Sequence, residues 1–340
     1  MKPYRQNMST RQNGLSLIEL MVAMVLGLLL MSGVVSIFLS AKQGYVNQDA
    51  TSQLQENARF ALDMMTREIR MAGYGGCSDA ISVANTLDGS AGLADTFSDG
   101  LIGYEGDATN SSFPADLSTA TANTDAIIIH TIDSNSSLGV TSHNPNAATI
   151  HLSESHSIKT GDILLLVDAN CSNMAIFANT GPTNNSNNAT TSNHNTGNLS
   201  SFSYENCTKK LKGNFDCSDT SGAQSVAYSQ GSSLLTVDSF AYYLAPSAFD
   251  TAVTSLYRLD IDGTSEEMVE GISDLEIFYG LATGSDIQYL KASAISAIQW
   301  VDVKSVRLIL TSNSLTFIDG APLTKTFTST VKIRNRGESL

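Results

Sequence analysis

Proline is scarce in the first third of this 340-residue chain. None occurs between Pro3 and Pro114, so no ring in that stretch removes a helical hydrogen bond. Residues 20–39 also lack any charged side chain. Twenty helical residues span about 30 Å, the thickness of a bilayer core. These absences permit one long helix that begins inside a membrane.

Motifs of common enzymes and metal sites are absent too. The chain has no GxSxG, no HExxH and no phosphate-binding glycine loop, and no CxxC spacing that would favour zinc. His151 and His156 are the closest pair of histidines, but their i, i+5 spacing fits neither one helix face nor one strand face. We therefore predict no enzymatic activity, no metal site and no cofactor. The histidines are expected in loops and on the surface: His130, His143, His151, His156 and His194.

Two further features have an ordinary structural explanation. Residues 260–263 read Asp-Ile-Asp-Gly and predict a β-turn, because an EF-hand calcium loop needs further ligands. Trp300 is the only tryptophan, and we expect it to pack at the interface of a sheet or helix.

Positive charge is scarce as well. The net charge is −14, and three of the cations, Lys2, Arg5 and Arg11, precede the first apolar segment. Without these three the charge would be about −17, which argues against nucleic-acid binding by the rest of the chain. The acidic composition, rich in Asn, Ser and Thr, is typical of an exported and solvated head.

The stretch from residue 14 to residue 39 reads GLSLIELMVAMVLGLLLMSGVVSIFL and carries one charge, Glu19. Three cations before it favour a cytoplasmic N-terminus. Gly14 precedes the apolar run, so cleavage there would leave the helix on the mature protein, unlike cleavage of a secretory signal. A carboxylate near mid-helix costs about 2.5–3.5 kcal/mol, and a new amine at Leu15 would lie on the same face as Glu19 and neutralise it. The alternative is an uncleaved signal anchor with an incidental glutamate.

The residues Gly14-Leu-Ser-Leu-Ile-Glu19-Leu-Met-Val resemble the class III signal of type IV pilins and type II secretion pseudopilins. The resemblance implies that a membrane prepilin peptidase cuts after Gly14 and methylates Leu15. It implies that Glu19 registers each subunit against its neighbour in the filament. Leu15 stands where the family usually has phenylalanine.

The helix is expected to continue beyond the membrane, from Leu15 to about Met71. Apolar residues recur in steps of three and four, and the first strong stop is Gly73. The predicted apolar face comprises Leu54, Ala58, Leu62, Met65 and Ile69. We predict a leader at residues 1–14, a transmembrane and filament-core helix at 15–39, its amphipathic continuation at 40–72 and a β-rich head at 73–340.

The predicted fold class is α+β, with the long helix packed on an antiparallel sheet with long loops. Residues 78–124 and the polar segment 179–200 are expected to be loop-rich. Apolar runs and alternation predict strands at 125–132, 148–152, 162–167, 234–244, 255–261, 275–279, 301–311 and 323–334. The last two are expected to form a closing hairpin.

Four cysteines lie beyond the apolar segment: Cys77, Cys171, Cys207 and Cys217. An even number in an oxidising compartment predicts two disulfides with three possible connectivities. The short loop between Cys207 and Cys217 favours that pair, which leaves Cys77 with Cys171 by elimination. Zinc is the competing interpretation, without CxxC spacing to support it.

Residues 67–77 and the last two predicted strands, which end in Arg-Asn, resemble PilW-type minor pilins. The resemblance implies a structural subunit of a tip-proximal priming complex that helps to initiate pilus assembly and supports adhesion, twitching motility or DNA uptake. The implied partners are other minor pilins, the major pilin, the prepilin peptidase, the inner-membrane assembly platform and a tip adhesin. The subunit would wait in the inner membrane with a periplasmic head and then join the pilus.

Two other functions share parts of this evidence. A minor pseudopilin of a type II secretion system would carry the same N-terminal signal. A periplasmic binding module or enzyme on a signal anchor would keep its leader.

Overall fold

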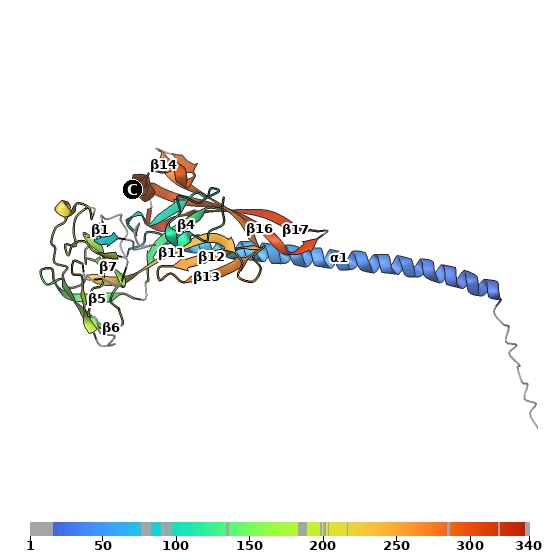
Figure 1. Cartoon of the computed structure of the whole chain (residues 1–340), viewed down its shortest axis with the longest axis horizontal. Helices are drawn as coiled ribbons and strands as arrows, with labels where there is room; N and C mark the ends of the chain where they lie inside the picture. The colour runs from blue at the N-terminus through green and yellow to red at the C-terminus, as the bar shows by residue number, and fades with distance from the viewer. Residues whose placement is uncertain are drawn as a thin grey trace, which may run out of the picture. The chain divides into compact units, whose positions relative to one another are not determined.

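The computed structural model describes residues 16–75, 83–89, 93, 97–133, 136–182, 189–197, 199, 202, 204–215, 217–283, 286–318 and 320–336. Within these ranges there is one α-helix, α1, which runs from Leu17 to Arg70 (Figure 1). The chain forms two units, residues 1–52 and 53–340, and the boundary falls inside α1. The predicted long helix is therefore present, with ends one or two residues from those expected.

Within the second unit, the C-terminal half of α1 packs into the largest core of the head. Ala58, Ala61, Met65 and Ile69 are fully buried, and they pack with apolar residues of two sheets. The predicted face is correct except that Leu62 is only partly buried at its edge. Steps of three and four keep these side chains on one side of the helix, so one face is covered and the other stays polar.

The larger sheet has eleven described strands. They are β1 (Val83–Asn85), β3 (Leu101–Tyr104), β4 (Ala126–Ile132), β5 (Leu138–Asn144), β6 (Thr149–His156), β7 (Ile163–Val167), β8 (Met174–Ala178), β9 (Ala189–Asn193), β11 (Ser233–Pro246), β12 (Thr254–Asp260) and β13 (Ser265–Glu270). β2 (Leu87–Gly89) pairs with β10 (Tyr204–Asn206).

The long strand β11 joins two parts of this sheet. Its first residues pair with β7 and β5, and the rest pairs with β4 and β12. The residues on the two sides belong to separate apolar clusters, one with α1 and another around β7 and β8. The single strand β11 thus connects the part of the head that packs on α1 to the part built around β5, β7 and β8.

The second large sheet has the strand order β15-β14-β16-β17. Its strands are β14 (Ile272–Thr283), β15 (Asp286–Leu290), β16 (Val303–Ile318) and β17 (Ala321–Lys332). β16 and β17 form the predicted closing hairpin, and both run beside α1 in Figure 1. Short 3-10 helices lie at Phe97–Asp99, Ala115–Leu117, Thr220–Gly222, Ala292–Ala294, Ala297–Asp302 and Arg334–Arg336.

The α+β fold class is confirmed: one long helix and a predominantly antiparallel head, in which β1 and β8 are the parallel pair among the described strands. The expected loop at 78–124 was wrong in part, because β1, β2 and β3 lie there. The expected loop at 179–200 likewise contains β9. These strands are three to five residues long and gain their stability from a partner strand rather than from their own pattern.

Candidate assembly interface

The N-terminal end of α1 is closed by a reciprocal pair of hydrogen bonds between Ser16 and Glu19. The Ser16 N–H donates to Glu19 Oε2 at 3.1 Å, and the Glu19 N–H donates to Ser16 Oγ at 3.2 Å. This is a capping box, which satisfies two backbone donors that the helix itself cannot satisfy. The charge of Glu19 thus lies at the positive end of the helix, where a carboxylate is favourable.

Sequence reasoning found Glu19 but missed Ser16. The signal was present, because Ser-x-x-Glu before an apolar run is the sequence signature of a capping box. Gly14 and Leu15, the predicted cleavage and methylation residues, lie outside the described residues. Their roles and the registration role of Glu19 remain predictions.

Beyond the cap, α1 exposes apolar side chains on every side. Large side chains from Leu17 to Leu39 are 50 % or more exposed, with Leu17 at 77 % and Ile37 at 72 %. Among the described residues, α1 is the helix long and apolar enough to cross a membrane. A helix that is apolar all round needs lipid or other helices around it.

Two glycines in this apolar segment are not required by the chain's own packing. A Cβ atom added at Gly27 or Gly33 would meet no atom within 4 Å. Small residues in membrane helices allow a neighbouring helix to approach closely.

The last turns of α1 are held by a buried polar contact. The Tyr242 hydroxyl of β11 donates a hydrogen bond to Glu68 Oε2. Burial raises the pKa of Glu68, while this hydrogen bond and the nearby Arg258 oppose the rise. Arg258 lies over the ring of Phe240 at 4.2 Å and pairs with Asp260 at 2.5 Å. A charged network thus fixes the helix against β11 and β12.

The end of α1 is also the point where the chain's C-terminal segment returns. Gly73 has φ +70°, a conformation that favours glycine, and its N–H donates to His130 O at 2.8 Å. The Arg336 guanidinium donates to the carbonyl oxygens of Asp99, Trp300 and Val303. Burial lowers the pKa of Arg336 to about 10, so it is still charged at neutral pH.

These contacts bring together the two segments that resemble PilW-type pilins. A Cβ atom at Gly73 would lie 3.4 Å from Gly100 Cα and 3.9 Å from Arg336 Nε. A Cβ at Gly100 would lie 2.7 Å from an Arg336 nitrogen. Gly100 therefore leaves the room that the arginine occupies, and Gly73 and Gly100 lie close together.

The expectation of surface histidines was wrong for four of the five. His130, His143, His156 and His194 are buried, and His151 is exposed. The reason is that each buried ring has a polar partner: Ser239 Oγ for His130 at 2.9 Å, Thr191 O for His156 at 3.0 Å, and the two Nε2 atoms of His143 and His194 at 2.9 Å. Among the described residues no three His, Cys, Asp or Glu side chains gather into a metal site.

Hydrogen bonds fix the tautomers of the His143–His194 pair. The Tyr228 N–H donates to His143 Nδ1 at 3.2 Å, so the proton of His143 is on Nε2 and points to His194. His194 then carries its own proton on Nδ1, which has no hydrogen-bond partner. Burial lowers the pKa of His143 to about 4 and that of His194 to about 3. Both rings are neutral at pH 7.

The other expected features are local structure. Residues 260–263 form the turn between β12 and β13, closed by the Gly263 N–H to Asp260 O at 2.9 Å. Trp300 is buried in the core that contains α1. Its ring packs edge to face with that of Tyr279, with the ring centroids 4.8 Å apart.

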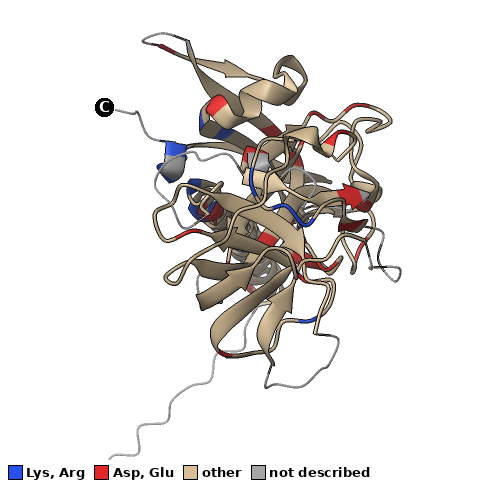
Figure 2. Ribbon diagram, turned by 90° about the vertical axis from the view of Figure 1, so that its left-hand side faces the viewer, with Lys and Arg blue, Asp and Glu red and all other residues tan. Residues whose placement is uncertain are grey.

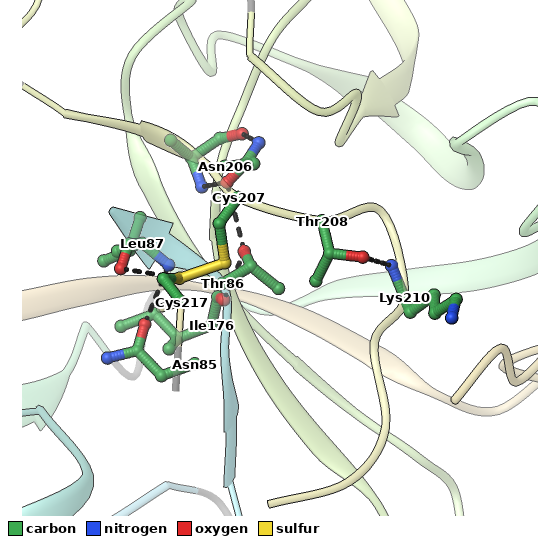
Figure 3. Close-up of a disulfide and its surroundings, with 10 residues drawn as sticks. Asn85, Thr86, Leu87, Ile176, Asn206, Cys207, Thr208, Lys210 and Cys217 are labelled. Atoms are coloured by element: carbon green, nitrogen blue, oxygen red, sulfur yellow. Dashed lines mark hydrogen bonds between the residues drawn. A yellow bond between two sulfur atoms is a disulfide. The ribbon is translucent and has the colours of Figure 1, made fainter. Parts of the chain in front are cut away.

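Figure 3 shows the disulfide between Cys207 and Cys217. The Cys207 N–H donates to Thr86 O at 2.8 Å, and the Thr86 hydroxyl donates to Asn206 Oδ1 at 3.1 Å. Cys217 Sγ lies 3.3 Å from Leu87 O. These contacts hold both cysteines of the disulfide beside β1 and β2. Cys171 is disulfide-bonded as well, and Cys77, its predicted partner, lies outside the described residues.

Two protein-family models match the chain. Residues 9–35 match the prokaryotic N-terminal methylation motif, and residues 241–329 match the type IV pilus-assembly protein W family. The first match contains Gly14 and the Ser16–Glu19 cap. The second begins within β11 and ends within β17, and residues of this segment pack on the C-terminal half of α1. No curated protein and no solved structure matches the chain.

Proposed function

We propose that this chain, which belongs to the PilW family of type IV pilus-assembly proteins, is a minor pilin that helps to initiate a pilus as part of a tip-proximal priming complex. The match at residues 241–329 carries the proposal. The N-terminal motif is shared by pilins and secretion pseudopilins, whereas this second match is to a pilus-assembly family and covers strands that hold the helix.

The N-terminal segment supplies a temporary anchor and then an assembly surface. In this proposal the prepilin peptidase cuts after Gly14 and methylates Leu15, and the helix at 15–39 stays in the inner membrane with the head, residues 73–340, in the periplasm. Extraction from lipid is unfavourable for exposed side chains such as Leu17 and Ile37 unless neighbouring helices cover them. Assembly therefore exchanges lipid for helix contacts, driven by the inner-membrane platform.

The size of the head favours a position at the tip. About 265 residues follow the helix, and a head of this size is difficult to repeat along a fibre and easy to place at its end. The partners in this role are other minor pilins, the major pilin and a tip adhesin. Adhesion, twitching motility and DNA uptake would follow from assembly.

The role is structural rather than enzymatic. Both matches are to pilin motifs and assembly proteins, not to enzyme families. Three hydrogen bonds of the buried histidines are made to groups inside the head.

Two measurements test the proposal. Mass spectrometry of the mature protein should give an N-terminus at a methylated Leu15; an intact leader would contradict the pilin assignment. Deletion of the gene should reduce surface pili and leave secreted enzymes at their normal level. Normal piliation with lost secretion would instead identify a type II secretion pseudopilin.

A further inference from the structure

β17 forms an open edge of the second sheet. Among the described strands it pairs only with β16. From Thr324 to Lys332 the pairing is regular, without a bulge, and Pro322 lies before this stretch. Alternate residues of such an edge direct N–H and C=O groups outward, and proteins usually block long regular edges. This edge is therefore a template on which another strand can pair.

A groove of about 410 Å³ runs between this edge and the C-terminal half of α1. Leu62 of the helix and Phe327 of β17 are partly buried against the core and give it an apolar floor. Arg59 and Lys325 line it and are exposed, and neither takes part in an ion pair among those of the described residues. Asp63 also lines the groove, and Lys325 Nζ lies 5.6 Å from the centroid of the Phe327 ring. The groove thus offers an apolar strip beside two cations and one carboxylate.

The charge around the groove is opposite to that of the head. Residues 303–336 contain six cations and one carboxylate, Asp319, whereas residues 73–302 contain six cations and 26 carboxylates. Arg70 lies on the same helix face as Arg59, with Asp63 as the acid between them. Figure 2 shows blue segments near the C-terminus, further blue segments on separate loops, and red segments spread over the head. Residues 303–336 are thus a basic segment in a chain of net charge −14.

We propose that the edge of β17 and this groove bind an acidic, extended peptide segment of a partner protein, which adds to the sheet as a fifth strand. Backbone hydrogen bonds to β17 give affinity, and alternate side chains give specificity. Apolar side chains of the segment cover Leu62 and Phe327, and its carboxylates meet Arg59 and Lys325. This inference does not depend on the pilus assignment, because it uses only the edge, the groove and the charge.

Other occupants fit the surface less well. A lipid headgroup or a nucleic acid would use the cations but neither the apolar floor nor the unpaired backbone edge. A second copy of this chain offers the acidic edge strand β13, but Glu267 of β13 already accepts the Ala248 N–H at 3.0 Å. β13 is also paired with β12 in its own sheet. The groove would therefore have to accept the edge of a whole sheet rather than a single strand.

Lys325 and Phe327 are two residues apart in β17 and therefore lie on the same face of the strand. The probe is a nine-residue synthetic peptide in which every second position carries glutamate and valine in turn, with threonine between them, so that both kinds of side chain share one face. Its binding to the full chain in detergent micelles is measured by fluorescence anisotropy. We expect Lys325→Glu and Arg59→Glu each to weaken binding about tenfold or more, since attraction becomes repulsion. Lys210→Glu makes the same charge change at an exposed residue outside the groove and should leave binding unchanged. Circular dichroism of each variant checks folding.

Control peptides separate strand addition from simple charge attraction. A peptide of equal charge interrupted by three prolines should not bind, because it cannot supply strand hydrogen bonds. The proposal would be overturned if the proline peptide bound equally well, or if an oligonucleotide or anionic vesicles displaced the first peptide. It would also be overturned if the first peptide did not bind at millimolar concentration. Self-association of the chain that Lys325→Glu abolishes, seen in sedimentation, would assign the edge to a second copy and overturn it too.

Discussion

At the residue scale, Glu19 combines two roles that can be separated. Its carboxylate closes the capping box with Ser16, and its charge is the feature that resemblance to pilins links to registration. Glutamine at this position also completes a capping box. The charge can therefore be removed by a substitution of Glu19 that keeps the cap, and the cap can be removed by a substitution of Ser16 that keeps the charge.

We predict that Glu19→Gln is still cleaved but is incorporated into pili poorly, because the cap remains while the charge is lost. Ser16→Ala is the matched variant: it loses about 1 kcal/mol of capping and keeps the charge, so it should assemble. Quantification of each variant in sheared pili, beside the processed form in membranes, provides the measurement. Normal incorporation of Glu19→Gln would refute a role of the charge.

Gly103 of β3 gives a residue-scale prediction for the core. A Cβ atom there would lie 1.9 Å from the hydroxyl of Tyr279, whose side chain is fully buried. Gly103→Ala should therefore lower the free energy of unfolding by about 1–3 kcal/mol, the usual cost of overpacking. Gly44→Ala, where a Cβ meets nothing within 4 Å, should not destabilise the protein. Urea unfolding in detergent compares the two; equal stability of both variants would contradict the packing argument.

At the element scale, the sequence predicted those segments whose pattern is strong. The absence of proline and the apolar repeat from Leu54 to Ile69 located α1. Apolar runs or alternation located eight strands: β4, β6, β7, β11, β12, β14, β16 and β17. The match to the type IV pilus-assembly protein W family at residues 241–329 includes most of the predicted hairpin of β16 and β17. Each of these segments carries its own period, so local sequence is enough.

The remaining elements depend on partners that the sequence does not reveal. β13 reads SEEMVE and is a strand because it pairs with β12; β5, with a histidine and an asparagine, pairs with β6. The clamp at the end of α1 joins Gly73, Gly100 and Arg336, far apart in the chain. The segments at both ends of this clamp resemble PilW-type pilins in sequence. The sequence did not indicate that the two segments lie next to each other in the fold.

This clamp yields a prediction with a neighbouring control. Arg336→Ala removes the donor to Asp99, Trp300 and Val303 carbonyls, and each acceptor left buried costs about 1–3 kcal/mol. The midpoint of urea unfolding should therefore fall clearly. Arg334→Ala removes the same charge from an exposed side chain and should change stability by less than about 0.5 kcal/mol. Equal effects of the two variants would mean that charge, rather than the clamp, stabilises the head.

At the scale of the whole molecule, buried histidines and buried carboxyl groups determine how the stability of the protein depends on pH. His130, His143 and His194 have pKa values lowered to about 3, 4 and 3 by burial, so the folded state binds fewer protons than the unfolded state below about pH 6.5. Their stabilisation is present above pH 6.5 and is lost as pH falls. Glu68 and Asp99 have raised pKa values and act in the opposite direction at lower pH, where carboxylates titrate.

We therefore predict that the free energy of unfolding decreases between about pH 6.5 and pH 5. Each fully neutral histidine contributes a slope of at most about 1.4 kcal/mol per pH unit, less for the coupled pair of His143 and His194. Urea unfolding at several pH values measures the slope. His130→Gln should lower this slope by about 1.4 kcal/mol per pH unit, the contribution of one proton. His151→Gln, at an exposed histidine, should leave the slope unchanged. A slope that His130→Gln does not alter would mean that this ring is protonated in the folded protein, and its burial beside Arg336 would then have no effect on stability.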